Sequence, residues 1–358
     1  MKQLFLILLL TAGLTAVQAQ SPYAHSDEPV LVYSLPATEL IFDLEIEKIT
    51  EKPGVFYQYS QRYLAANRVV TEETVNYQLK SVRMTTRPVV DKALRFSVSP
   101  ELVPGLVLTP EGLLAGVNVP SPRKVIKEHH IERRMEIPTA RPEGMIALNQ
   151  EYMMAGSTAK MAEGAAYQIY AIRESRLNLL SGEMEHLPAD GESLKIMLQG
   201  LDRQECELTE LFTGQVRKEI IHHRISLVPD SSQHEALLFR LSTKRGVVAN
   251  DDLGGEPYYL AIDHDPIPVT APVVDKTKGS KKSKAPAPVV ALYTVLPVNA
   301  TIEVSDGVNT LLREQASISH FGVLLSHDAS LFKSKSVQME VDPATGRMVR
   351  IQDVAPSK

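Results

Sequence analysis

The sequence predicts an α+β protein that is mostly antiparallel β-sheet, with an inserted antiparallel helical hairpin and a small C-terminal β-sandwich-like domain. Apolar and polar residues alternate over several stretches before residue 120 and after residue 214, as in strands with one buried face. Between them, residues 157–214 follow helical spacing. A run of proline, lysine, serine and alanine at 269–288 then separates two strand-rich parts.

The composition is that of an ordinary globular protein with room for two domains. Hydrophobic residues make up 44% of the chain and charged residues 23%. We therefore expect a signal peptide at 1–19, a β-rich domain at 28–268 that contains the hairpin, a linker or loop at 269–288 and a small all-β domain at 289–355. The single cysteine, Cys206, cannot form an internal disulfide. We expect it to be buried and inert, although an odd thiol could also pair with another chain.

The N-terminus has the pattern of a secretory signal peptide. Lys2 precedes an uninterrupted apolar run, residues 4–10, and small residues up to Ala19 suit cleavage before Gln20. This run is too short to cross a bilayer, and no later apolar run approaches the roughly 20 residues that a spanning helix needs. No cysteine lies near the cleavage point to carry a lipid anchor. We therefore expect an exported, periplasmic or extracellular protein that is not a lipoprotein and has no transmembrane span after cleavage.

The first 120 residues are expected to be mainly strand. Residues 30–48 alternate with a mostly acidic outer face, and residues 74–87 alternate again. Between them, residues 55–66 have helical spacing. Residues 105–116 predict a hairpin around a Pro-Glu-Gly turn, and the proline-rich, charged stretch 120–142 predicts an exposed connection or edge.

Two helices joined by a short loop are predicted next. The first runs from Ala159 to Leu180 and is followed by Gly182, a residue type that commonly ends helices. Asp190 can cap the second helix. An apolar seam in the second helix is formed by Leu194, Met197, Leu198, Leu201, Leu208, Leu211 and Phe212.

Four polar residues lie on or beside these apolar stripes and therefore need partners. If the hairpin is symmetric about its loop, Glu205 lies opposite 166–170 and not opposite Arg176. A hydrogen bond from Tyr170 to Glu205 is then expected, with no direct ion pair to Arg176 implied. A structural role is favoured over a carboxylate poised in a cleft. The candidate binding residues are Arg173, Arg176, Asp202 and Glu205.

Strand patterns return after the hairpin, at 220–228, 236–241 and 258–262. The linker 269–288 carries five lysines, and the part that follows it consists of short strands joined by turns between residues 291 and 351.

The usual catalytic, metal and nucleotide patterns are missing. A net charge of −5 gives no basic field for nucleic acid. His234 has no second histidine four residues on, and the pairs 129–130 and 222–223 would point to opposite faces of a strand. The sequence has neither a Gly-x-Ser-x-Gly elbow nor a glycine-rich phosphate loop. We therefore predict no catalytic residue, no metal site and no cofactor.

Short phrases along nearly the whole chain carry a family resemblance. They lie at 32–36, 58–64, 109–114, 172–183, 201–205, 211–214, 255–259, 321–323 and 342–346. Together they resemble a family of exported proteins from Gram-negative bacteria that is classified as a domain of unknown function, DUF4831. The resemblance implies a location in the cell envelope and no activity, ligand or catalytic residue. Relative to the family pattern, the lysine-rich stretch 276–284 resembles an insertion.

The leading hypothesis is a non-enzymatic exported cell-envelope binding or scaffold protein, with another envelope protein as partner. The alternative is a periplasmic hydrolase with an unrecognised active site. An enzyme should show one deep pocket with converging polar groups, whereas a binding protein should show a shallow groove or an apolar patch. A third hypothesis is a module that docks on an outer-membrane barrel through an exposed strand edge.

Overall fold

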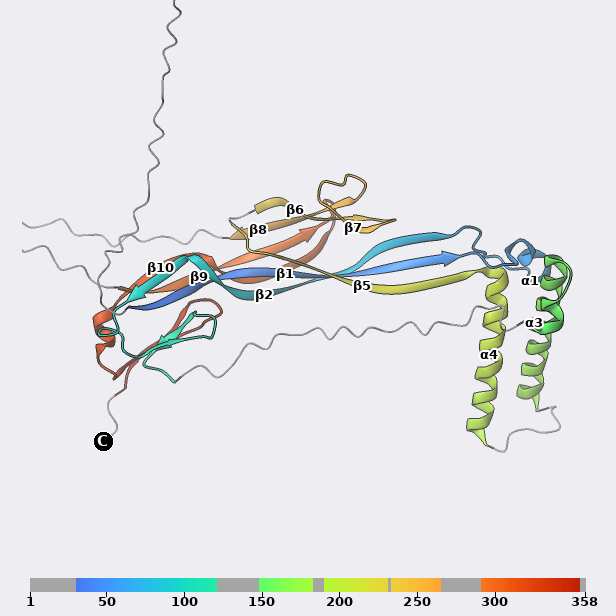
Figure 1. The fold of residues 1–358 in the computed structure, drawn as a ribbon, viewed down its shortest axis with the longest axis horizontal. Helices are drawn as coiled ribbons and strands as arrows, with labels where there is room; N and C mark the ends of the chain where they lie inside the picture. Colours follow the sequence, from blue (N-terminus) through green and yellow to red (C-terminus); the bar gives the residue numbers. More distant parts are fainter. Residues whose placement is uncertain (1–29, 121–147, 183–189, 231–232, 265–290, 355–358) are drawn as a thin grey trace, which may run out of the picture.

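The computed structural model describes residues 30–120, 148–182, 190–230, 233–264 and 291–354. The molecule is elongated: a long, narrow sheet joins a β-rich body at one end to a helical hairpin at the other (Figure 1). The expected α+β class, mostly antiparallel β, is confirmed. The expected signal peptide, the connection at 120–142 beyond its first residue, and the linker lie outside the described residues.

The long sheet has three antiparallel strands in the order β2-β1-β5. Strand β1 (Leu31–Lys52) is central, between β2 (Thr74–Val98) and β5 (Gln215–Leu227). At about 3.3 Å per residue, the 22 residues of β1 span about 70 Å. Strand β5 pairs with β1 from Leu40 to Lys52. We call the part of this sheet that extends beyond the body the arm.

A second sheet has five strands in the order β10-β9-β8-β6-β7. Its strands are β6 (Gln233–Ser242), β7 (Gly246–Val248), β8 (Glu256–His264), β9 (Ala291–Ser305) and β10 (Thr310–Asp328). It packs on the apolar face of β1, as the alternation of 30–48 predicts. The main core includes Leu40, Phe42, Leu44, Ile46, Leu260, Ile302, Val304 and Ile318.

A third sheet of four short strands closes the end of the body, in the order β12-β11-β4-β3. Its strands are β3 (Leu106–Leu108), β4 (Leu114–Val117), β11 (Val337–Val341) and β12 (Met348–Asp353), and a 3₁₀ helix, η3 (Ala329–Lys333), precedes β11. The predicted turn between β3 and β4 is confirmed, with Gly112 at a φ of 89°. A second core includes Tyr33, Leu35, Val103, Leu114, Phe332 and Met339.

Strands from the expected C-terminal β domain at 289–355 pair with strands from earlier in the chain. Strand β9 pairs with β8, which precedes the expected linker, with Ile302 opposite Ile262. Strand β11 pairs with β4, from the first third of the chain. The C-terminal strands thus complete sheets that earlier strands begin, and their apolar side chains share two cores with those of β1.

The helical hairpin is confirmed at the far end of the arm (Figure 1). Helix α2 (Gln150–Met153) precedes α3 (Thr158–Ser181) and α4 (Gly191–Thr213). As predicted, Gly182 ends α3 with a φ of 79°, and the side chain of Asp190 caps α4 by accepting from the Ser193 N–H. No helix within the described ranges is long and apolar enough to span a membrane.

The turn that joins β1 to β2 closes the base of the hairpin. The helix expected at 55–66 is shorter, a 3₁₀ helix η1 (Tyr57–Tyr59) followed by α1 (Ser60–Leu64), because Ala65 adopts a left-handed conformation with a φ of 48°. A third core joins this turn to the helices through Phe56, Leu148, Ala165, Ile169, Leu208 and Phe212.

Candidate functional site

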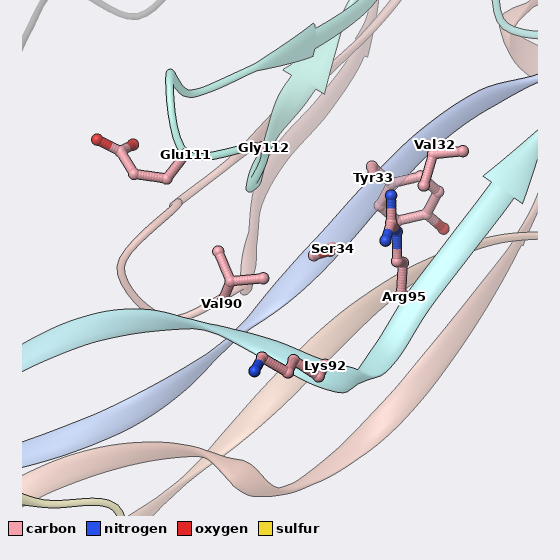
Figure 2. Close-up of a pocket in the computed structure, with 8 residues that line it drawn as sticks. All are labelled: Val32, Tyr33, Ser34, Val90, Lys92, Arg95, Glu111 and Gly112. Atoms are coloured by element: carbon pink, nitrogen blue, oxygen red, sulfur yellow. The ribbon is translucent and has the colours of Figure 1, made fainter.

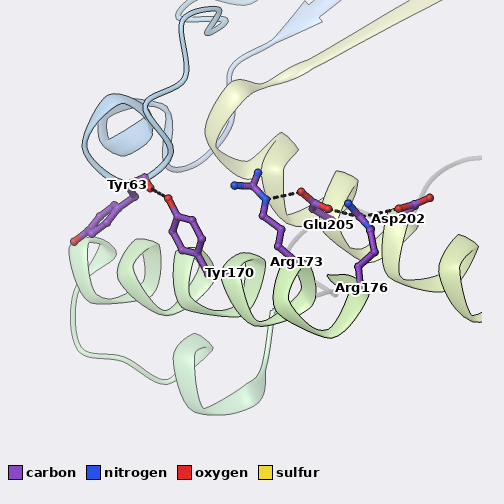
Figure 3. A network of polar contacts seen from close by, with 6 residues as sticks. All are labelled: Tyr63, Tyr170, Arg173, Arg176, Asp202 and Glu205. Carbon is purple, nitrogen blue, oxygen red and sulfur yellow. Dashed lines mark hydrogen bonds and ion pairs between the residues drawn. The ribbon is translucent and has the colours of Figure 1, made fainter. Parts of the chain in front are cut away.

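The structure brings all four candidate residues together between α3 and α4 (Figure 3). Arg173 Nε donates to Glu205 Oε1 at 2.7 Å, and Arg176 Nη2 lies 2.6 Å from Asp202 Oδ1. Arg176 Nη2 also forms an ion pair with Glu205 Oε2. Each pair on one helix is one turn apart, so both side chains of a pair face the other helix.

This arrangement corrects the expected partners of Glu205. The carboxylate is paired with two arginines, and the Tyr170 hydroxyl donates instead to the carbonyl oxygen of Tyr63 at 2.7 Å. Arg176 faces Glu205 because the helices are offset by about two turns from a symmetric hairpin. Helix α4 accordingly reaches beyond the end of α3 (Figure 1).

Glu205 is held in its ionised form. Burial alone would raise the pKa of its carboxyl group, but the hydrogen bonds from Arg173 and Arg176 outweigh burial and lower the pKa below its ordinary value. Its side chain is only 16% exposed. A carboxylate with a lowered pKa and two cationic partners is poorly suited to take up a proton, so the cluster does not favour general acid or base chemistry.

The cluster ties three parts of the hairpin together. Arg173 lies over the ring of Tyr170, with its Cζ 5.5 Å from the ring centroid, and Tyr170 reaches back to α1 through the Tyr63 carbonyl. Within the described residues, Arg176 Nε is buried without a hydrogen-bond partner. Such a donor costs about 1–3 kcal/mol unless other contacts compensate. The ion pairs of Arg173 and Arg176 with Glu205 join α3 to α4, and they therefore fix the offset of the two helices.

Large apolar side chains are exposed along the same helices. On α3, Tyr167 is 63% exposed, Leu177 65% and Leu180 64%, and on α4 Ile196 is 61% exposed. The seam predicted for α4 is therefore buried only near its base, at Leu208, Leu211 and Phe212. Cys206, which we expected to be buried, is exposed on α4, with Sγ 3.6 Å from Glu210 Oε1.

The outer face of the long sheet carries a row of ion pairs. The acidic face predicted for 30–48 is confirmed, and β2 and β5 supply the cations. Arg87 pairs with Glu39 at 2.6 Å, and Arg224 pairs with Asp43 at 2.7 Å. The remaining pairs are Arg83–Glu45, Lys80–Glu47 and Lys218–Glu47. The sequence showed the carboxylates, but their partners depend on strand register.

Sequence reasoning missed a cavity of about 420 Å³ at the body end of β1, lined by Tyr33, Ser34, Lys92, Arg95 and Glu111, among others (Figure 2). Its lining comes from three separate stretches, so no local pattern indicates it. Within the part of the chain that the structure describes, no group of three or more histidine, cysteine, aspartate or glutamate side chains is placed to hold a metal ion.

The comparisons with known proteins identify a family and nothing finer. No curated protein and no solved structure matches the chain. The model of one family, described as a domain of unknown function, DUF4831, matches residues 30–349. This match runs from the residue before β1 into β12 and so includes the body, the arm and the hairpin. The protein therefore belongs to the DUF4831 family.

Proposed function

We propose that this protein is a non-enzymatic, exported cell-envelope protein that binds or scaffolds another envelope component through its helical hairpin. The observation that carries this proposal is the position of the hairpin, which stands at the end of the arm (Figure 1). Its helices expose large apolar side chains.

The arm is built to hold the hairpin away from the body. Its central strand pairs on both sides, and the row of ion pairs runs along the outer face of the long sheet from the body toward the arm. A sheet of three strands resists bending more than a single connection, because each strand is held by backbone hydrogen bonds. Such a spacer suits a protein that must contact a partner at a distance from its own body.

The hairpin presents a defined surface. The ion pairs of Arg173 and Arg176 with Glu205 set the offset of α3 and α4, so the exposed side chains have fixed relative positions. Leu177 and Leu180 lie one turn apart on the exposed side of α3, on either side of the buried Leu179 in the sequence. Exposed apolar groups of this size commonly mark protein contact sites.

Export rests on the N-terminal pattern. We propose that the chain is cleaved after Ala19 and acts in the periplasm or at the cell surface. Mass measurement of the N-terminus in fractionated cells tests this step. Recovery of the uncleaved chain, with Met1 attached, from the cytosol would contradict it.

Site-specific photo-crosslinking in intact cells tests the binding surface. A photoreactive residue at Leu177 or Leu180 is expected to give a discrete adduct, whereas one at Leu253, which is 83% exposed on the body, is not. Equal adducts at all three positions, or none at the hairpin, would contradict the proposal. Turnover of a cell-wall substrate by the purified protein would replace it with the hydrolase hypothesis.

A further inference from the structure

The cavity of about 420 Å³ in the body exists because β2 leaves β1 for a short distance. Ser34 pairs with Arg95, but Pro36 pairs with Val90, so residues 91–94 bulge out of the ladder. The Ser34 N–H donates instead to the carbonyl oxygen of Gly112 at 3.0 Å. The cavity lies between this bulge and the β3–β4 turn (Figure 2).

Two cations line the cavity: Lys92 in the bulge, and Arg95 directly after it. The cations farther along β2, Lys80, Arg83 and Arg87, each pair with a carboxylate of β1. Lys92 and Arg95 form no ion pair with any residue that the structure describes. Residues 31–38 of β1 carry no carboxylate, so these two cations lie beyond the row of ion pairs and place their charge at a concave surface, where it is focused.

The third polar group is Ser34. It is only 7% exposed, and within the described residues its hydroxyl makes no hydrogen bond. Tyr33 beside it has a structural role, because its hydroxyl oxygen accepts from the Tyr293 N–H at 2.7 Å and burial raises its pKa. Tyr33 therefore stays neutral and forms a fixed wall.

We propose that this cavity binds a phosphate group. A guanidinium, an ammonium and a hydroxyl from Arg95, Lys92 and Ser34 offer donors from several directions. A phosphate group has at least three terminal oxygens to accept from them, whereas a planar carboxylate has two. The carboxylate of Glu111 also lines the cavity and opposes any bound anion.

Equilibrium dialysis of the full chain with radiolabelled inorganic phosphate, at low ionic strength and neutral pH, tests the proposal. We expect saturable binding that weakens as salt is added. Arg95→Gln and Lys92→Gln should each weaken binding about tenfold or more, because each removes a charged donor. Glu111→Gln should strengthen binding severalfold, because it removes a like charge.

Matched controls separate a site from general attraction. Arg68→Gln removes the same charge from an exposed position outside the cavity and should leave binding unchanged. Unfolding of each variant without phosphate confirms that it folds. The proposal is overturned by lack of saturable binding, by an equal loss in the Arg68 variant, or by acetate binding as well as phosphate at matched ionic strength.

Discussion

Arg173 and Glu205 face each other across the helical hairpin, with Arg173 Nε 2.7 Å from Glu205 Oε1. The residues are 32 positions apart in the sequence. Their contact, with the second ion pair from Arg176, fixes which turns of α3 and α4 meet. The hairpin has little buried apolar surface beyond its base, so we expect its outer half to depend on this contact.

Glu205→Gln should loosen the hairpin, because the amide cannot form either ion pair and leaves two arginines without their partner. We expect a loss of about 1–2 kcal/mol in local stability. Hydrogen exchange of α3 and α4 measures it. Glu174→Gln, an exposed carboxylate of α3, is the control and should change little. Equal protection of α3 and α4 from hydrogen exchange in both variants would contradict a role for the ion pairs of Glu205 in hairpin stability.

Acid should weaken the same contact. The pKa of Glu205 is lowered in the folded protein from its ordinary value of 4.5. Stability from this group is therefore fully present above that ordinary pKa and is lost as the pH falls through the folded value. The difference in hydrogen exchange between the wild type and Glu205→Gln should shrink as the pH is lowered through this range. A difference independent of pH would contradict the assignment.

His327 should give a second, separate pH dependence. Burial lowers its pKa below the ordinary value of 6.5, and its Nε2 lies 2.8 Å from Thr294 Oγ1. Below pH 6.5 the unfolded chain takes up the proton first, so stability should fall as the pH drops toward the folded pKa.

Urea unfolding at several pH values measures this contribution. His327→Gln keeps a group that can bond to Thr294 but does not titrate, so its stability should fall less between neutral pH and mild acid. His223→Gln changes an exposed histidine of β5 and should leave the dependence of the unfolding free energy on pH as in the wild type. If both variants had the same dependence of unfolding free energy on pH, His327 would be excluded as the source of that dependence.

Two glycines should respond oppositely to alanine. Gly214, between α4 and β5, has a φ of 84°, and an added Cβ would lie 2.5 Å from the Lys52 carbonyl oxygen. Gly214→Ala should therefore cost about 2 kcal/mol or more. Gly200, inside α4, has open space around it, and Gly200→Ala should stabilise the helix by about 0.5–1 kcal/mol. Thermal unfolding with circular dichroism compares them, and equal effects would contradict this reasoning.

Asn118 should connect the C-terminal segment to β4. Its φ is 54°, and its Nδ2 donates to the carbonyl oxygens of Phe332, Ser334 and Val337, the last at 2.8 Å. Asn118→Gly keeps the backbone conformation and loses only the amide, so it should cost about 1–2 kcal/mol. Asn118→Ala should cost more, because alanine also resists this φ. Denaturant unfolding distinguishes them; a milder effect of alanine would contradict this explanation.

Local patterns in the sequence predicted the strands and helices better than the contacts between them. The alternation at 30–48 gives β1, and Gly182 and Asp190 mark helix ends where the structure has them. These features depend on neighbours within a few residues. Only the helix at 55–66 was overestimated, because a left-handed Ala65 ends it.

Partners far apart in the sequence could not be predicted in this way. The Arg176–Glu205 pair depends on the offset of two helices, and the pairing of β8 with β9 depends on strands that meet across 265–290. The cavity beside Ser34 depends on a bulge that no residue type requires. Each is decided by the register of packed elements.

The length of β1 also makes the arm a lever. Strand β2 carries a second irregularity at Lys80, where Glu45 pairs with Ser81 and Ile46 with Leu79. Beyond Ile46, its last residue in the main core, β1 continues for about 20 Å to Lys52, so a rotation of about 5° where the arm leaves the body moves the end of the strand by about 2 Å. Small changes where the arm meets the body are therefore passed to the hairpin as displacements that grow with distance along the arm.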